Sequence, residues 1–589
     1  MTEKKHVTAL LILLFFILST TVCAQPQDIP PVLYKLFDYG TVPDQVPFGS
    51  THWYMWSALN PQSGAYNWAP IDKHLADEEG ITITLPSGEV IPKPVVIFVV
   101  PHLSSDMCPG TFFQDCTPDW VYAQMDAAYP DDLRPRVCGR RVGHVLTSGS
   151  LQAVLPAYDD WLWRTRWIEF VRAFGEHYAE NERIVALVAG TGLDGETQPA
   201  KTWVVDWRQL LGAQASGVEY RFAQNHVPDT LGEYVFSFPN DRIFLNMAPG
   251  GAARSWWAEL ARRYPDNVGK KNSGQQPDQD IHQGYGGWPG TWDAFVPGVD
   301  DLPVWTETAH SCGPDDWGYW ALLQGLHYMP ALMTLHSDWF TRLDPELLNW
   351  ATAHLGGDVA QLDTVWAVLR ETEYPYQGWG DGEGASGHVG DWQQGITRLS
   401  QAEPVLSKDI PWEADPFYGR QCRRTGEGSY SKVGFSIDPR WIEASEGPYA
   451  LHLIMLDYGT DMFKVGWTRA DGSAAWAKMS KSNSGWRHFY FTLNNIDLAE
   501  GFHIDGLYDG PEYIHMVELY TDTTPTAPTP TATSGPSLYP TNTRYPTATY
   551  QPTFTPPPTC TPTRTVQPTY TARPTLTPRP TYTEQPNCI

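Results

Sequence analysis

The sequence predicts a (β/α)8 TIM barrel, followed by an all-β sandwich domain and a disordered Thr/Pro-rich tail. Residues 30–345 alternate short apolar runs with amphipathic stretches, which is typical of consecutive βα units around a parallel sheet. From about residue 411 the hydrophobic period changes to two, as in half-buried strands. Eight alternations of strand and helix favour a barrel over a sandwich for the first part of the chain.

The N-terminus reads as an export signal. Lys4 and Lys5 precede an apolar run, and small residues before Gln25 offer a cleavage point. We expect residues 1–24 to be a signal peptide and the mature protein to be secreted or held at the cell surface. The alternative, a lipid anchor on Cys23, is disfavoured because residues 20–22 lack the leucine that such signals carry. No later segment reaches the roughly 18 apolar residues of a membrane helix, so no transmembrane helix is expected in the mature chain.

The barrel domain is predicted over residues 25–410. Helical segments are expected at 161–178, 255–264 and 317–328, and in the first of these apolar residues recur every three or four positions. Residues 345–410 are expected to close the barrel and lead into the next domain. The eight strands are expected at 32–37, 52–56, 94–100, 184–189, 243–246, 268–270, 304–307 and 332–335.

A long insertion, residues 103–157, follows the third strand and is rich in Pro, Asp and Cys. Long connections on a barrel usually lie at the catalytic rim; the alternative is a surface loop without a role. Seven cysteines remain after cleavage of the signal. In an exported protein, a disulfide from Cys108 to either Cys116 or Cys138 would staple this insertion. The odd count leaves at least one thiol free or paired to another chain.

The sandwich domain is predicted over residues 411–522. Alternating strands are expected at 431–437, 449–457, 462–468, 487–493 and 515–520, with Gly, Asp and Asn turns between them. The tail, residues 523–589, is a Thr/Pro repeat with little to bury. We expect it to stay extended, as a stalk that tethers the protein to a surface or as a linker.

Composition narrows the classes of partner. The formal net charge of −27 disfavours nucleic acid, because such a surface repels phosphate backbones. Aromatic residues make up 13% of the chain, including 26 Trp. Indoles fill cores, but they also stack on sugar rings. A neutral substrate such as a carbohydrate is compatible with this composition, and the aromatic residues are equally consistent with an ordinary core and surface.

Two glutamates end two of the expected strands. Glu196 follows the fourth strand and Glu307 ends the seventh, so both are expected at the rim where barrel active sites lie. Paired carboxyl groups are what acid–base chemistry at a glycosidic bond requires. Amides, imidazoles and indoles expected at the same rim would bind the sugar. These candidate substrate-binding residues are Trp53, Trp56, His102, Asn246, Asn272, Trp305, His336 and Trp339.

Other enzyme classes have weaker support. Residues 190–195 contain a literal G-x-G-x-x-G, but four strands' worth of chain precede it and the glycines run into Pro199 instead of opening a helix, which disfavours a dinucleotide site. The chain has neither H-E-x-x-H nor G-x-S-x-G, which disfavours a zinc hydrolase and a serine esterase. No cofactor and no metal are expected.

Residues 53–72, WYMWSALNPQSGAYNWAPID, resemble the second strand and following loop of β-galactosidase-like, family 42-like clan A glycoside hydrolases. Residues 167–189 before Glu196 and residues 303–307 are similar to the same family. The resemblance covers about residues 30–400. It implies a retaining glycosidase with Glu196 as general acid/base and Glu307 as nucleophile.

One position departs from the family. Gly195 precedes Glu196, where the family has an asparagine that binds the sugar 2-hydroxyl, so Asp194 or Asn246 would have to supply that contact. The departure also leaves open a second hypothesis, a barrel that binds carbohydrate without cleaving it. The sandwich domain resembles jelly-roll modules of carbohydrate enzymes through residues 422–425, 435–438 and 457–459.

Overall fold

The computed structural model describes residues 29–36, 42–43, 45–131, 133–148, 151–201, 207–247, 253–273, 302–308, 315–369, 391–399, 403–405, 422–425, 431–507 and 509–521. All of them belong to one compact unit, residues 1–539. The predicted signal peptide and the predicted tail lie outside the described residues.

Eight parallel strands close into a barrel in the order in which they follow one another along the chain. The first strand pairs with both the second and the last, which closes the ring. All eight predicted strands are confirmed, and the doubly wound alternative is excluded because its sheet would be open. The strands are β1 (Leu33–Lys35), β2 (Phe48–Met55), β5 (Val95–Val100), β13 (Ile184–Val188), β14 (Arg242–Asn246), β15 (Val268–Lys271), β16 (Val304–Glu307) and β17 (Leu332–Leu335).

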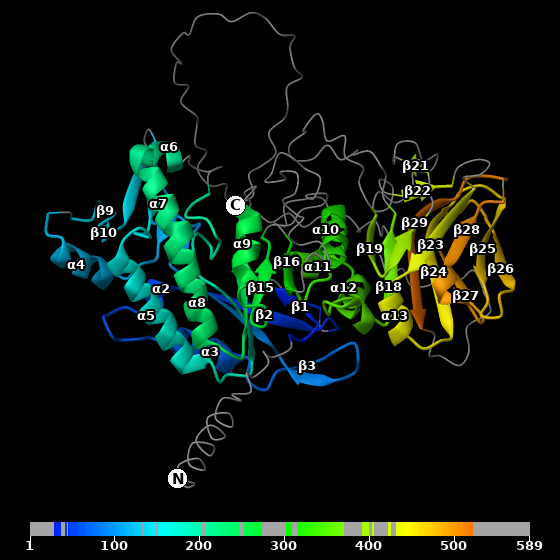
Figure 1. Ribbon diagram of the computed structural model, residues 1–589, viewed down its shortest axis with the longest axis horizontal. Coiled ribbons are helices and arrows are strands. Elements are labelled where there is room, and N and C mark those ends of the chain that lie inside the picture. The colour runs from blue at the N-terminus through cyan, green and yellow to red at the C-terminus, as the bar shows by residue number, and fades with distance from the viewer. Residues whose placement is uncertain are drawn as a thin grey trace, which may run out of the picture. The chain divides into compact units, whose positions relative to one another are not determined.

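Helices follow most of these strands. The carboxylate of Asp160 accepts hydrogen bonds from the first backbone amides of α5 and caps it. Helices α5 and α8 lie side by side (Figure 1), and Gly175 allows the close approach, because a Cβ atom there would lie 2.5 Å from Ser237. The helices of this part are α2 (Trp56–Leu59), α3 (Ala69–Asp77), α5 (Trp161–Tyr178), α6 (Trp207–Leu211), α7 (Ala215–Arg221), α8 (Val227–Ser237), α9 (Ala253–Ala261), α10 (Asp315–His327), α11 (Trp339–Arg342) and α12 (Pro345–Ala353).

Two kinds of core hold the barrel together. The inside is filled by side chains such as Phe98, Phe244 and Trp305, whose rings meet edge to face. The outside is covered by helices through an aromatic layer that includes Trp163 and Trp167. Burial of rings this large supplies much of the free energy of folding. The barrel is therefore a packed scaffold whose chemistry lies at its ends.

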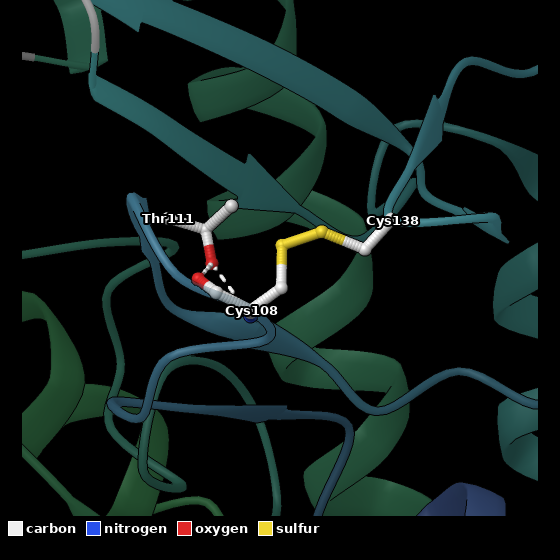
Figure 2. Close-up of a disulfide and its surroundings, with 3 residues drawn as sticks. All are labelled: Cys108, Thr111 and Cys138. Atoms are coloured by element: carbon white, nitrogen blue, oxygen red, sulfur yellow. Dashed lines mark hydrogen bonds between the residues drawn. A yellow bond between two sulfur atoms is a disulfide. The ribbon is translucent and has the colours of Figure 1, made fainter.

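The insertion after β5 is a small structured region with a disulfide. Cys108 is bonded to Cys138, as Figure 2 shows, so the second of the two predicted pairings is the one formed. The hydroxyl of Thr111 donates to the carbonyl of Cys108 at 2.6 Å, and Cys116 is buried outside any disulfide. The elements of the insertion are β6 (His102–Leu103), β7 (Thr111–Phe112), β8 (Gln114–Asp115), α4 (Asp119–Ala128), β9 (Arg136–Val137), β10 (Arg140–Arg141), β11 (His144–Ser148) and β12 (Leu151–Leu155).

Antiparallel sheets follow the barrel and form the sandwich. One contains β19-β18-β29-β22-β21 with β24 and β27, the other has the order β20-β23-β28-β25-β26, and one apolar core joins them. Their elements are β18 (Thr364–Val368), β19 (Trp392–Gln394), β20 (Ile396–Arg398), β21 (Glu403–Val405), β22 (Cys422–Arg424), β23 (Lys432–Ile437), α13 (Pro439–Ala444), β24 (Tyr449–Asp457), β25 (Met462–Thr468), β26 (Ala474–Ser480), β27 (Gly485–Thr492), β28 (Phe502–Asp505) and β29 (Tyr513–Thr521).

The start of the sandwich corrects the predicted boundary at residue 411. Strand β18 pairs antiparallel with β29, so residues 364–368 belong to the sandwich and do not close the barrel. Polar contacts join the two parts: the indole of Trp350 donates to Glu518 at 2.7 Å, and the hydroxyl of Tyr319 lies 2.7 Å from Nε2 of His515. Within the described ranges, no helix combines the length and the hydropathy needed to span a bilayer.

Candidate active site

The loop after β13 holds Glu196 at the carboxyl end of the barrel. Glu196 forms a parallel bridge with Asn246, the last residue of β14, and the amide of Thr197 donates to the Asn246 carbonyl at 2.8 Å. The hydroxyl of Thr191 donates to the Glu196 carbonyl at 2.8 Å. The backbone of Glu196 is thus fixed on both sides.

The three glycines of the G-x-G-x-x-G run have packing roles in this loop. A Cβ atom on Gly190 would lie 2.0 Å from the Val99 carbonyl, and one on Gly192 would lie 2.2 Å from the Gln198 carbonyl. Gly195 has φ +73°, in the left-handed region that favours glycine. No helix begins in residues 189–201, which the structure describes throughout. The run is therefore a tight turn without the helix that a dinucleotide site needs.

Gly195 also explains the departure from the resembling family. A Cβ atom on this residue would meet the side chains of Val188 and Val100 at 3.2 and 3.7 Å. Both valines are buried, so a larger side chain here would start toward buried apolar groups. In this conformation a side chain directly before Glu196 would crowd Val188 and would require positive φ, which favours glycine.

The Glu196 carboxyl is buried among polar neighbours. Nε2 of Gln198 donates to its Oε2 at 2.5 Å, and Nζ of Lys201 lies 3.9 Å from its Oε1. Burial, assisted by the negative charge of Asp194, raises the pKa of Glu196 although Lys201 acts to lower it. A raised pKa suits a carboxyl group that must hold a proton near neutral pH.

Asp194 precedes the glutamate by two residues and behaves oppositely. Its carboxylate lies 2.6 Å from Nζ of Lys201 and accepts the backbone amide of Ser104 at 2.8 Å. Burial acts to raise the pKa of Asp194, but these partners hold it below its ordinary value. Two neighbouring carboxyls are thereby pushed toward different protonation states, a pattern that marks acid–base sites.

Glu307 ends β16 and forms a buried ion pair. Nζ of Lys271, the last residue of β15, lies 2.7 Å from Oε2 of Glu307. The directed hydrogen bonds of Lys271 go to Ser273 Oγ at 2.9 Å and to the Asn272 carbonyl at 3.3 Å. The amide of Glu307 donates to Oδ1 of Asn272 at 3.2 Å. Strand six thus holds both the backbone and the side chain of Glu307.

A continuous set of contacts links the two glutamates. Ser273 Oγ, which receives the Lys271 hydrogen bond, donates to Oδ1 of Asn246 at 2.8 Å, and Asn246 bridges to Glu196. The charged groups near each glutamate also shift the pKa values of groups near the other. Burial acts to lower the pKa of Lys201, but nearby carboxylates, Glu307 among them, raise it. Lys271 in turn acts to lower the pKa of Glu196. The groups therefore form one electrostatic cluster.

Three other predicted residues lie at this end of the barrel. Asn272 is fully buried, and its Nδ2 has no hydrogen-bond partner among the described residues. The backbone amide of His336 donates to Thr308, the residue after Glu307, at 3.2 Å. Trp53 stacks on Phe98 with ring centroids 4.0 Å apart and is partly buried.

Three predicted tryptophans are placed elsewhere. Trp56 is fully buried between Trp163 and Trp167 in the helix layer, and Trp339 is buried in a second outer core. Trp305 fills the barrel interior, where its indole donates to Thr334. These rings are covered by protein, so we do not retain them as sugar-stacking groups.

His102 has both of its ring nitrogens engaged within the protein. Its ring nitrogens lie 3.1 Å from the Pro199 carbonyl and 3.0 Å from the Val154 carbonyl. Burial lowers its pKa to about 4. His102 is fully buried and connects the insertion to the loop that carries Glu196, so it supports this loop instead of meeting a ligand.

The sequence analysis did not predict Lys201 or Lys271 as site residues, and it gave Asp194 only as a possible contact to the sugar. The sequence does contain a signal for Lys271. The barrel strand Val268–Lys271 ends in two lysines, and charges buried in such a strand require partners. Lys201 follows an irregular loop, where a surface lysine gives the same pattern. In the part of the chain that the structure describes, no group of three or more His, Cys, Asp or Glu is arranged to hold a metal ion.

Comparisons with known proteins return enzymes that act on glycosides. Endoglycoceramidase II from Rhodococcus sp. is similar at 10% identity over 81% of this chain and 88% of that chain, with a TM-score of 0.30. The β-galactosidase from Rahnella sp. R3 shares 11% identity over 56% and 57%, with a TM-score of 0.30. A psychrophilic family 10 endo-β-1,4-xylanase shares 13% over 49% and 78%, with a TM-score of 0.28. Because these identities and TM-scores are low, the assignment of the fold depends on the observed strand order of this chain and not on the comparisons.

Neither a protein-family model nor a curated protein matches the chain. The class that fold and site define is thus a (β/α)8 barrel with a two-glutamate cluster at its carboxyl end, joined to a β-sandwich.

Proposed function

We propose that the protein is an exported glycoside hydrolase that cleaves O-glycosidic bonds of oligo- or polysaccharides by a retaining, β-galactosidase-like mechanism. The observation that carries the proposal is the connected cluster between Glu196 and Glu307 at the ends of strands four and seven. A general acid and a nucleophile are needed on the two sides of the scissile bond, and the retaining reaction requires carboxyl groups about 5–5.5 Å apart.

Each glutamate has a role that suits its surroundings. Glu196, with its raised pKa, would donate its proton to the leaving oxygen while the carboxylate of Glu307 attacks the anomeric carbon and the glycosidic bond breaks. Glu196, now ionised, would then take a proton from water, and this water would displace Glu307 from the sugar. Lys271 would hold the Glu307 carboxylate in place, and Lys201 would hold Asp194 ionised beside Glu196.

Sugar hydroxyls require polar partners near these carboxyls. The Nδ2 donor of Asn272 is buried and without a partner among the described residues, so it can donate to a ligand at no cost to another hydrogen bond. We propose Asn272, Asn246, His336 and Trp53 as the substrate-binding residues. Export by the predicted signal peptide, and tethering through the tail, remain part of this proposal.

A substrate series with Gln variants tests the proposal. The purified protein is assayed on aryl glycosides whose phenol leaving groups differ in acidity, and then on polysaccharides. Glu307→Gln should lose activity on every substrate. Glu196→Gln should lose roughly 10²–10⁴-fold on poor leaving groups and much less on acidic phenols, which need no protonation. Glu176→Gln, on the exposed face of α5, is the matched control.

Two results would reject the proposed reaction. Full activity of both Glu196→Gln and Glu307→Gln would show that neither glutamate is catalytic. Binding of glycans by the wild-type protein without any turnover would instead establish the alternative, a carbohydrate-binding barrel.

A further inference from the structure

One face of the sheet β20-β23-β28-β25-β26 points away from the sandwich core. Successive residues of a strand point to opposite faces, and Phe435, Val465 and Ile504 are among those that fill the core. The residues between them form the other face. This outer face is independent of the barrel site and of the chemistry proposed there.

A row of residues crosses this outer face in register. Trp476 pairs with Gly466, Gly466 with His503, and His503 with Gly434. Trp476 is 60% exposed, although an indole is costly to leave in water. The two glycines carry no side chain, and the imidazole of His503 lies across Gly466, where a Cβ atom would be 2.5 Å from the ring. The exposed indole of Trp476 thus stands beside the imidazole of His503, which covers the buried Gly466.

A second row beside it is cationic. Lys464 stands opposite Lys478 on one side and opposite Asp505 on the other, and Lys432 also faces Asp505. The Nζ atoms of Lys464 and Lys432 lie 3.1 and 3.6 Å from Asp505 Oδ2. Nζ of Lys478 lies 5.3 Å from the centroid of the Trp476 ring. This row therefore has three lysines and one carboxylate, Asp505, which gives it excess positive charge on a chain with formal net charge −27. Like charges directly opposite, as in Lys464 and Lys478, destabilise a sheet, and an anionic partner would remove that cost.

We propose that this face binds an acidic polysaccharide, a chain of pyranose rings that bear carboxylate groups. The indole of Trp476 would stack on a ring, and the ammonium groups of the second row would pair with carboxylates. Nucleic acid fits less well. It carries one charge per roughly 1.7 Å of duplex, which three lysines do not match and which the rest of this acidic chain repels.

Affinity electrophoresis of the full chain tests this site. The gel contains polygalacturonate, the same polymer with its carboxyl groups methyl-esterified, or single-stranded DNA. We expect polygalacturonate to retard the wild-type protein and the esterified polymer to bind at least tenfold more weakly. Trp476→Ala should weaken binding tenfold or more, and Lys464→Gln with Lys478→Gln should weaken it and reduce its salt dependence. Trp161→Ala removes an indole of similar exposure (59%) from α5 and should change nothing.

Several results would overturn the proposal. These are absence of retardation of the wild-type protein by polygalacturonate, equal retardation of Trp476→Ala and wild type, or tighter binding of DNA than of polygalacturonate. A wild-type dimer that Trp476→Ala converts to a monomer would show that the face instead binds a second copy. The substituted side chains are exposed or half-exposed, and circular dichroism checks that each variant is folded.

Discussion

The Nζ atom of Lys271 lies 2.7 Å from Oε2 of Glu307, and the two side chains are 0% and 11% exposed. Removing either charge from such a pair leaves the other uncompensated in a poorly solvated position. The pair therefore ties the stability of the barrel to the geometry of the candidate site.

Lys271→Met should destabilise the protein by about 3–5 kcal/mol, because the Glu307 carboxylate loses its buried partner. The free energy of unfolding is measured by urea titration. Lys73→Met breaks an exposed ion pair with Asp77, whose side chains are 70% and 55% exposed, and should change stability by about 1 kcal/mol or less.

The double variant separates loss of the charge partner from loss of packing. Glu307→Gln in the Lys271→Met background should recover part of the lost stability, since no uncompensated charge remains. If the two substitutions simply add, the ion pair does not couple these residues and this interpretation fails.

Lys201→Met should move the pH dependence of the proposed glycosidase activity. The Lys201 ammonium, 3.9 Å from Glu196, acts to lower the pKa of this carboxyl, so its removal raises the pKa further. The acid form of Glu196 then persists to higher pH, and the basic limb of the kcat/KM profile should shift upward. A basic limb that stays in place or moves downward would contradict the role of Lys201.

Gly190→Ala should destabilise the barrel by about 1–3 kcal/mol or more, because the new methyl group would lie 2.0 Å from the Val99 carbonyl. Gly217→Ala is the matched control: a Cβ atom on this α7 residue has nothing within 4 Å, and alanine should stabilise the helix by about 0.5–1 kcal/mol. The melting temperatures of the two variants and of the wild type, measured by thermal denaturation, give the comparison. Equal effects of the two substitutions would show that the loop does not require glycine.

His488 predicts how stability changes in acid. Burial, together with neighbouring His452, lowers the pKa of His488 to about 3, against an unfolded value near 6.5. The unfolded chain therefore takes up a proton first as the pH falls. The stabilising contribution is complete above about pH 6.5 and is lost between there and about pH 3.

His488→Asn removes this titration, so the free energy of unfolding should fall less steeply with pH below 6.5 than in the wild type. Urea titrations at several pH values measure the slope. His177→Asn, which alters a histidine side chain that is 44% exposed, should leave the slope unchanged. A wild-type slope in His488→Asn would assign the acid sensitivity to other groups.

Local patterns were enough to predict the barrel strands and the ends of strands four and seven. Short apolar runs such as residues 184–188 are buried on both faces, so each run marks a strand in the sequence. The strands then occur in the barrel in the same order as in the chain. Local patterns could not predict where the sandwich begins, because β18 pairs with β29, which lies about 150 residues later in the chain.

The candidate site was predicted less completely than the fold. An indole just after a strand has the same sequence pattern whether it faces the rim or a core, which is why Trp56 and Trp339 were assigned to sugar binding. The ion pair of Lys271 with Glu307 depends on the register of neighbouring strands, which local patterns do not contain.

Covalent trapping tests the central claim most directly. The protein is incubated with an activated 2-deoxy-2-fluoro glycoside of a sugar that it hydrolyses, and its peptides are analysed by mass spectrometry. We predict one added glycosyl group, on Glu307, accumulating in step with loss of activity. A label on Glu196 or elsewhere, or inactivation without a label, would contradict the assignment of Glu307 as nucleophile and Glu196 as acid/base.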